Sequence, residues 1–192
     1  MNAENNNQQN QPGNRRPSLC FYHANPKGTG SAARMNLHPA HDMTDGCVML
    51  RIANQMTVGD RRGPNPTFPR FDWENSLCVK LAFEDLTEML RVFRGECESI
   101  NDGKGLFHRS PKGLTNIRLR HLLGPVQGYS LDVYRGESRA GILLNPAEAL
   151  GLCESISGAL YLVSFGIPML VPHDTSAYEA QAREVRHDAA AA

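Results

Sequence analysis

Arginine and aromatic side chains are interleaved in one stretch of the first half of the chain, within residues 54–75. The stretch is rich in proline and glycine, so we expect a loop there. Guanidinium groups pair with phosphates, and flat rings stack on the bases of a single strand. The side chains that could do this are Arg61, Arg62, Arg70 and Trp73, with Phe68 and Phe71 among them. The alternative is that the rings pack the loop onto the body of the protein while the arginines are solvated.

A pattern of an aromatic residue, a histidine, two further residues and Pro-Lys-Gly occurs twice. The first copy is residues 22–28, and the second is residues 107–113. The side chains of this pattern that could stack on bases or pair with phosphates are Tyr22, Phe107, Lys27 and Lys112. Ordinary solvated turn lysines, preserved by common ancestry of the two copies, are the alternative.

His23 and His108 occupy equal places in the two copies, each beside the aromatic residue. A histidine with a structural partner at a strand end is the expectation, and contact with a phosphate or a base is the alternative. Arg34, Arg118 and Arg120 fall on the polar positions of the alternating segments that follow. They would contact phosphates if that face meets a ligand, and would form an ordinary solvated face otherwise.

Residue patterns that would support catalysis are weak. His38, His41 and Asp42 could ligate a metal, but the sequence identifies no further ligand and no supporting shell. No cysteine has a local setting, such as a helix N-terminus, that would lower its pKa. The Gly-Lys-Gly at residues 103–105 lacks the strand-to-helix setting of a phosphate-binding loop. The carboxylates are scattered, so we expect a non-catalytic protein without a metal or a cofactor.

Alternating apolar and polar residues predict the strands that must carry these side chains. In the first half these segments include residues 33–37, 48–52 and 77–81, and a helical pattern follows. In the second half they include residues 117–120, 129–134 and 140–144, again with a helix after them. Each Pro-Lys-Gly predicts a hairpin turn. We therefore predict an α+β fold that is an internal duplication of a four-stranded antiparallel sheet followed by a helix.

Capping boxes predict where the two helices begin, with an N-cap residue three positions before a glutamate. In the first helix this pattern places Asp85 at the N-cap and Glu88 at the third position. In the second it pairs Asn145 with Glu148, with Pro146 at the first helical position. Apolar residues at helical spacing give each helix one face for the core.

The chain ends differ in composition from the part between them. Residues 1–18 are dominated by Asn and Gln and predict a disordered tail, and residues 173–192 predict a flexible one. We expect a single folded domain over residues 19–172. Within it, the first copy covers residues 19–100 and the second covers residues 104–166, both to within a few positions.

Charge and cysteine content limit the partners and the compartment. The 20 Lys and Arg residues balance 20 Asp and Glu, whereas a strong excess of positive charge would have indicated nucleic acid. The five cysteines include no Cys-x-x-Cys pair and are expected to be buried thiols in a reducing compartment, which favours a cytoplasmic protein. No segment approaches the ~20 apolar residues of a membrane span, so no membrane partner is expected.

Two copies of a curved four-stranded sheet and a helix, with a Lys-Gly hairpin between the first two strands, resemble the Whirly fold. Plant Whirly proteins, kinetoplastid mitochondrial RNA-binding proteins and, more distantly, Pur-alpha repeats share this fold. The plant proteins carry Lys-Gly-Lys-Ala in the hairpin region. Here the corresponding residues are Lys27-Gly28-Thr29-Gly30 and Lys112-Gly113-Leu114-Thr115, so the second lysine is absent from both copies.

The resemblance implies that single-stranded DNA or RNA binds across the sheets of a homo-oligomer, most often a tetramer. Its phosphates would lie near Lys27, Lys112, Arg61, Arg62 and Arg70, and its bases would stack on Tyr22, Phe107 or Trp73. Oligomerisation would also hide the open edges of the sheets. The alternative, which the balanced charge favours, is a protein-interaction or scaffold module of the same fold that binds no nucleic acid.

Overall fold

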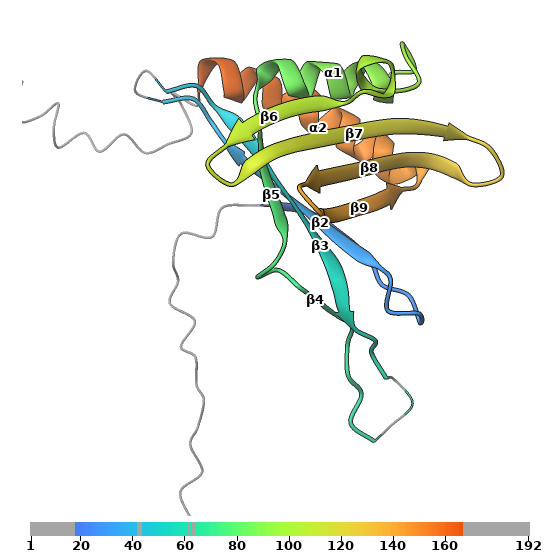
Figure 1. Ribbon diagram of the computed structural model, residues 1–192. Helices are drawn as coiled ribbons and strands as arrows, with labels where there is room; N and C mark the ends of the chain where they lie inside the picture. Colours follow the sequence, from blue (N-terminus) through green and yellow to red (C-terminus); the bar gives the residue numbers. More distant parts are fainter. Residues whose placement is uncertain (1–17, 42–43, 61, 63, 167–192) are drawn as a thin grey trace, which may run out of the picture.

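The computed structural model describes residues 18–41, 44–60, 62 and 64–166, and these residues form two antiparallel sheets and two long helices (Figure 1). The first sheet is formed by β1 (Ser18–His23), β2 (Ser31–His38), β3 (Cys47–Thr57), β4 (Arg70–Phe71) and β5 (Leu77–Leu81). The second sheet is formed by β6 (Leu106–Ser110), β7 (Gly113–Leu123), β8 (Gln127–Arg135) and β9 (Ser138–Leu144). The helical elements are α1 (Phe83–Phe93), the short 3₁₀ helix η1 (Ile100–Gly103) and α2 (Pro146–Phe165).

The element order confirms the predicted duplication of a four-stranded sheet followed by a helix. Strands β1, β2, β3 and β5 with α1 correspond to β6, β7, β8 and β9 with α2. The first copy has an insertion relative to the second, residues 58–76 between β3 and β5, and this insertion is not only a loop. Its two-residue strand β4 pairs with the end of β3, so the first sheet has a fifth strand.

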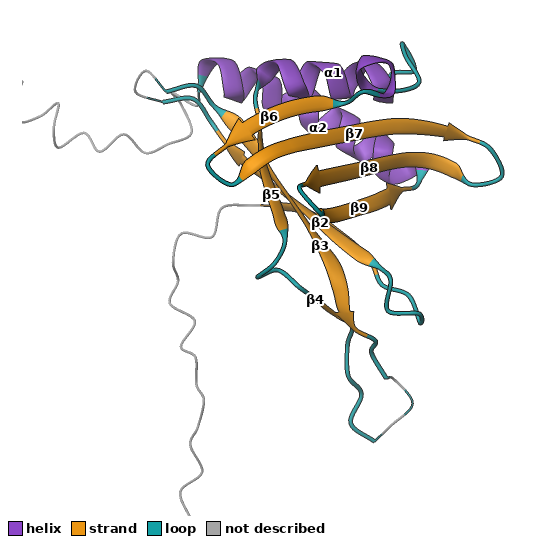
Figure 2. Cartoon of the chain, viewed as in Figure 1, coloured by secondary structure: helices purple, strands orange, loops and turns teal. Residues whose placement is uncertain are grey.

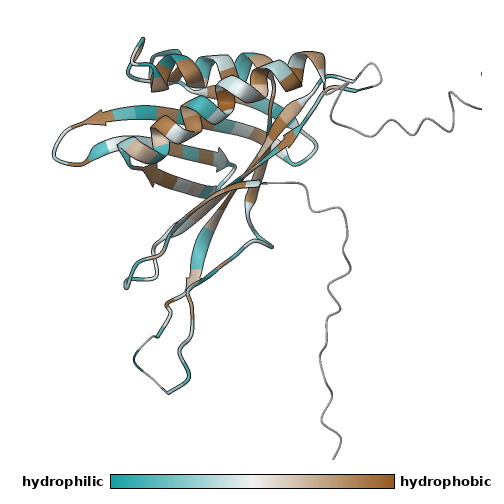
Figure 3. Cartoon of the chain, turned by 180° about the vertical axis from the view of Figure 1, so that it is seen from behind, coloured by the Kyte–Doolittle hydropathy of each residue, from teal (hydrophilic) through white to brown (hydrophobic). Residues whose placement is uncertain are grey.

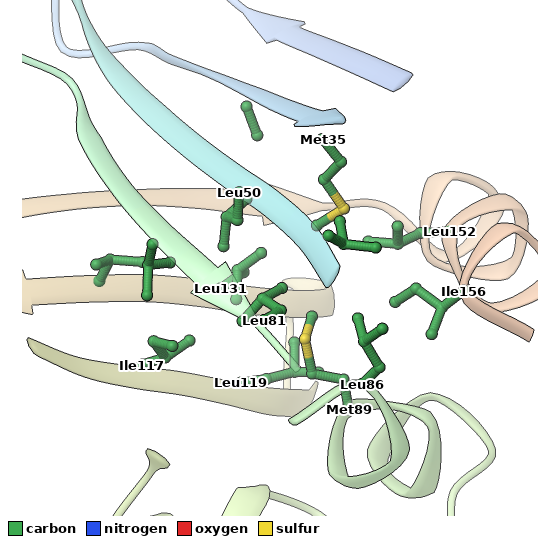
Figure 4. Packing of buried hydrophobic residues seen from close by; sticks show 14 of the residues in the cluster. Met35, Leu50, Leu81, Leu86, Met89, Ile117, Leu119, Leu131, Leu152 and Ile156 are labelled. Carbon is green, nitrogen blue, oxygen red and sulfur yellow. The ribbon is translucent and has the colours of Figure 1, made fainter. Parts of the chain in front are cut away.

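Alternation along the strands separates a core face from an outer face in each sheet. In β3, Leu50 and Ile52 are fully buried while Arg51 between them points to the other face. The core faces of the two sheets and the two helices enclose one apolar cluster, part of which Figure 4 shows. The strands of the first sheet run across those of the second, and both helices lie together on one side (Figure 2).

The helix of the second copy is hydrogen-bonded to the loop between β2 and β3 of the first copy. Near the end of α2, the Leu162 carbonyl accepts from the Ala40 N–H at 3.0 Å, and the Val163 carbonyl accepts from the Gly46 N–H at 3.1 Å. The backbones are so close there that a Cβ on Gly46 would lie 2.6 Å from the Val163 Cα. A larger residue at position 46 would therefore push α2 away from the loop between β2 and β3.

The capping-box prediction is confirmed for α2 and wrong for α1. Asn145 is the N-cap of α2, and its side chain and that of Glu148 each accept a backbone N–H of the other residue at 2.9 Å, as predicted. The first helix was predicted wrongly, because it begins three residues earlier than expected. Ala82 is its N-cap, and the Asp85 carboxylate accepts the Ala82 N–H at 2.8 Å from the third helical position.

Several sequence-based boundaries lie outside the described residues. These are the tail at residues 1–17, the end of the expected domain at residues 167–172, and the tail at residues 173–192. Ser18, which the prediction placed in the N-terminal tail, is the first residue of β1.

Candidate nucleic-acid interface

A row of four side chains crosses the outer face of the first sheet. Cys20 of β1 is opposite Arg34 of β2, Arg34 is opposite Arg51 of β3, and Arg51 is opposite Cys78 of β5. Residues directly opposite on neighbouring antiparallel strands share a face. Two guanidinium groups are therefore neighbours at the centre of this sheet.

Three aromatic rings, Tyr22, Phe71 and Trp73, gather beside this row and are called the aromatic cluster below. The Tyr22 ring centroid lies 5.7 Å from that of Phe71 and 6.5 Å from that of Trp73, the latter pair edge to face. The Arg34 guanidinium carbon lies 4.6 Å from the centroid of Trp73, which is a cation–π distance. Tyr22 is 54% exposed, so the cluster presents an open ring surface beside a cation.

Arg51 fixes the position of Trp73 by donating hydrogen bonds to the Trp73 backbone and to a neighbouring serine. Its Nη2 donates to the Trp73 carbonyl at 2.6 Å and to Ser76 Oγ at 2.8 Å, while the Ser76 hydroxyl donates to the same carbonyl at 2.7 Å. The Trp73 N–H donates to the Phe71 carbonyl at 3.0 Å. Trp73 is therefore held in place against the first sheet, as the packing alternative expects, and it is only half-buried. That these rings stack on bases stays a prediction.

The cluster changes the acid–base properties of two neighbours. A hydrogen bond with Tyr22 is the main reason that the pKa of Arg34 is raised above its usual value, and contact with Cys20 adds to this. Burial works to raise the pKa of the Cys20 thiol, but hydrogen bonds with Ser18, Tyr22 and Arg34 outweigh it and lower that pKa. No local stretch of sequence reveals this setting, which corrects the expectation for the cysteines, because Arg34 reaches Cys20 across strands and not along the chain.

Lys27 lies at the tip of a loop that buried hydrogen bonds hold in shape. The Gln55 side-chain oxygen accepts the N–H groups of Asn25 at 2.9 Å and Gly30 at 3.1 Å, and its amide donates to the Asn25 carbonyl at 3.1 Å. The Asn25 side chain in turn accepts the Lys27 N–H at 3.0 Å. The exposed Lys27 side chain thus leaves from a fixed backbone.

Lys112 and Phe107 belong to the second sheet, apart from the aromatic cluster. The β6–β7 hairpin closes through Pro111 and Lys112 alone, since Ser110 pairs with Gly113. Both hairpins carry an exposed lysine between the first two strands of a copy, as predicted, but the first uses a longer loop. Figure 1 shows the two hairpin tips at different ends of the molecule, so Lys27 and Lys112 do not form one site in a single chain.

The arginines of the insertion are spread along a projecting loop. Arg70 is exposed in β4, next to Phe71 of the cluster, and its N–H donates to Thr57 Oγ1 at 3.1 Å. Arg62 is exposed farther out, where its N–H donates to Asp60 Oδ1 at 2.9 Å. Arg61 lies outside the described residues. Of the predicted contact residues, the structure therefore brings the rings of Tyr22 and Trp73 together, and Arg70 adjoins Phe71 of the cluster along the chain.

Both histidines have carboxylate partners. His23 Nε2 lies 2.7 Å from Glu148 Oε1, and His108 Nε2 lies 3.0 Å from Asp85 Oδ1. The structural expectation for these two residues is met.

The outer face of the second sheet also carries cations on a ring. The guanidinium carbons of Arg118 and Arg139 each lie 5.2 Å from the centroid of Tyr134. Sequence reasoning missed Arg51 and Tyr134 as possible contact residues, although both fall on the polar positions of alternating segments that it had identified.

The part of the chain that the structure describes contains neither a metal-ligand cluster nor a membrane-spanning helix. Within it, no three side chains of His, Cys, Asp or Glu are grouped so as to hold a metal ion. All five cysteines are free thiols, of which Cys47 and Cys153 are buried. None of the described helices is long and apolar enough to cross a membrane.

Comparisons with known proteins identify the fold through structure and not through sequence. No family model and no curated protein sequence matches the chain. The crystal structure of WHY1 from Arabidopsis thaliana is similar over 93% of this chain and 96% of that one, with 15% identity and a TM-score of 0.58. The structure of a guide-RNA-binding protein complex bound to a guide RNA is similar over 78% of this chain and 94% of that one, with 18% identity and a TM-score of 0.53.

The trypanosome MRP1/MRP2 structures are similar over 76% of this chain and 84% of theirs, with 18% identity and a TM-score of 0.50. These likenesses extend over most of the compared chains and agree with the duplicated order of strands and helices. The chain has a Whirly-like fold.

Proposed function

We propose that this protein binds single-stranded nucleic acid, without catalysis, on the outer faces of its sheets. The observation that carries the proposal is the aromatic cluster with Arg34 on Trp73 and Tyr22 exposed beside it. A single strand needs rings for its bases and cations for its phosphates within a few ångströms of each other. That combination exists on the outer face of the first sheet, despite the balanced charge of the whole chain.

The similar structures support the proposal, because one of them is a guide-RNA-binding complex with its guide RNA. On the proposed path, bases stack on Tyr22 and Trp73 while Arg70, Arg62 and Lys27 lie near phosphates. Phe107 and Lys112 would contact a second stretch of the same nucleic-acid strand, or a strand that is bound to a neighbouring subunit. DNA and RNA share these contacts, so both are candidate ligands.

We also propose a homo-oligomer, with a tetramer favoured. Leu150, Tyr161 and Phe165 are all exposed on α2, and the Tyr161 and Phe165 rings lie 5.3 Å apart. Figure 3 shows apolar residues recurring along this helix. Exposed apolar side chains that adjoin one another, as the Tyr161 and Phe165 rings do, are typical of subunit contacts. A cytoplasmic location is proposed from the five free thiols.

The test is a fluorescence-anisotropy titration with labelled single-stranded DNA and RNA, repeated over a range of salt concentrations. Binding that weakens as salt rises, and that duplex DNA competes for poorly, is expected because phosphate pairing releases counterions and stacking requires unpaired bases. A protein that binds no oligonucleotide at low salt would instead be the scaffold module of the same fold.

A further inference from the structure

The central position of the outer face differs in charge between the two sheets. In the first sheet, Arg51 of β3 is opposite Arg34 of β2. In the second sheet the corresponding residue is Asp132 of β8, opposite Arg118 of β7. A carboxylate repels phosphate, so this position on the second sheet does not suit the backbone of a nucleic acid. It suits a group that donates hydrogen bonds.

Asp132 is held in place by hydrogen bonds from two neighbours on the second sheet. Arg139 Nη2 donates to its Oδ1 at 3.0 Å, and the Ser130 hydroxyl donates to its Oδ2. Only a glycine fits opposite, because a Cβ on Gly141 would lie 2.3 Å from Asp132 Oδ1. The residue is 4% exposed, but a carboxylate has about four acceptor positions and these two donors occupy two of them.

A cavity of about 320 Å³ opens beside this carboxylate, where the edge strand β9 meets β3 of the first sheet. Its lining includes Asn54, Ser130, Asp132, Arg139, Gly141 and Leu143. Asn54 comes from the first copy and donates to the Arg139 carbonyl at 3.3 Å, so both copies build the wall. The Arg139 side chain is 62% exposed, so this part of the wall faces the solvent.

Among the bases, guanine matches a carboxylate best. Its Watson–Crick edge presents N1–H and an N2 amino group side by side, which can donate to the two oxygens of one carboxylate. Thymine and uracil present a single imino donor, and cytosine and adenine present an amino group beside an acceptor nitrogen that the carboxylate repels. Single-stranded nucleic acids expose these edges to proteins.

We propose that this cavity binds an unpaired guanine by its Watson–Crick edge, with Asp132 accepting from N1–H and the N2 amino group. Arg118 and Arg139, which flank Tyr134, lie on the same face and can pair with the adjoining phosphates. The inference rests on the proposed function and adds a base preference to it. The first sheet, with Arg51 at the corresponding place, has no such preference.

The experiment compares three labelled single strands of thymidine that carry guanosine, inosine or no substitution at internal positions. Inosine lacks only the N2 amino group. The wild-type protein should bind the guanosine strand about tenfold more tightly than the thymidine strand, the order of one bidentate base contact, with inosine between them. Equal affinity for all three strands would overturn the inference and leave the proposed function intact. Failure to bind any strand would overturn both.

Two variants locate the preference. Asp132→Asn should lose the difference between guanosine and inosine while still binding the thymidine strand, because an amide places an N–H against a base donor. Glu137→Gln removes the same charge from the exposed turn between β8 and β9, and should keep the difference. An Asp132→Asn protein that folds, as its melting curve shows, and still distinguishes guanosine from inosine would overturn the assignment to this cavity. The wild-type comparison decides the question even if that variant does not fold.

Discussion

Glu148 of the second copy divides its two carboxylate oxygens between a helix cap and a histidine of the first copy. Oε2 accepts the Asn145 N–H at 2.9 Å, and Oε1 lies 2.7 Å from His23 Nε2. The first copy repeats the arrangement with Asp85, whose Oδ2 accepts the Ala82 N–H while Oδ1 lies 3.0 Å from His108 Nε2. Each helix start is therefore tied to the first strand of the opposite copy.

Removal of the charge of Glu148 should weaken this tie without removing the cap. In Glu148→Gln the amide oxygen can still accept the Asn145 N–H, so the loss reports the contact with His23. We expect the free energy of unfolding to fall by about 1 kcal/mol, the order for a partly exposed hydrogen bond to a carboxylate. Urea denaturation measures it. Glu154→Gln, on an exposed position of the same helix, should change stability much less.

Trp73→Ala should weaken binding of single strands by about 1–3 kcal/mol while leaving the dependence on salt nearly unchanged, because stacking releases no counterions. Anisotropy titrations over several salt concentrations measure both quantities. Phe68→Ala is the matched control, since it removes an exposed ring of the same insertion. If Trp73→Ala lowers the melting temperature but leaves affinity intact, the ring serves only to pack the insertion.

Arg70→Ala should weaken binding to all single strands alike and lower the slope of log affinity against log salt by about 0.7, the value for one phosphate contact on a single strand. Arg91→Ala provides the comparison. It removes an equal charge from α1, where Arg91 pairs with Glu88, and should leave the slope unchanged. Equal slopes for the wild type and Arg70→Ala would remove Arg70 from the proposed path.

Cys20 should react with iodoacetamide at lower pH than a thiol in an unstructured peptide. Its hydrogen bonds with Ser18, Tyr22 and Arg34 favour the thiolate and lower its pKa, so the reactive form appears earlier as pH rises. Peptide mapping by mass spectrometry separates Cys20 from the other four cysteines. In Arg34→Gln the reactivity profile should move to higher pH, and an unmoved profile would show that Arg34 does not act on this thiol.

Tyr161→Glu should shift the protein to a smaller assembly. A charge on the apolar side of α2 would have to be buried in a subunit contact, which is costly without a partner charge. Light scattering should give a tetramer for the wild type at micromolar concentration and a smaller species for the variant. A monomeric wild type would contradict the proposed assembly, and Lys80→Glu, on an exposed position of the first sheet, tests whether any added charge has the same effect.

The fold was largely predictable because its signals are local. Alternation identified the strands around Leu50 and Leu131, and the box at Asn145 and Glu148 gave the start of α2. The start of α1 was misplaced because Asp85 fits two capping patterns. It stands three residues before Glu88, as an N-cap residue would, and three residues after Ala82, which is the actual N-cap. Two overlapping patterns compete there, and an alanine N-cap leaves no signature of its own.

The candidate site was predictable only as a set of residue types. The stretch at residues 54–75 indicated that Trp73 and Arg70 could meet a ligand, but not that Arg51 holds the Trp73 carbonyl. The contact of Arg34 with Trp73 and the lowered pKa of Cys20 both depend on which residues stand opposite each other on separate strands. That register is set by pairing over long distances along the chain, which a pattern within one segment does not encode.

The bond between His23 and Glu148 joins residues 125 positions apart, and it has a consequence for synthesis. A growing chain completes β1, β2 and β3 long before α2, the last described element, can cover them. Until β9 and α2 are synthesised, the apolar faces of β2 and β3 lack the elements that cover them in the folded protein. Such long-range closure slows folding. The two copies are thus repeats in sequence, but each depends on the other to complete its fold.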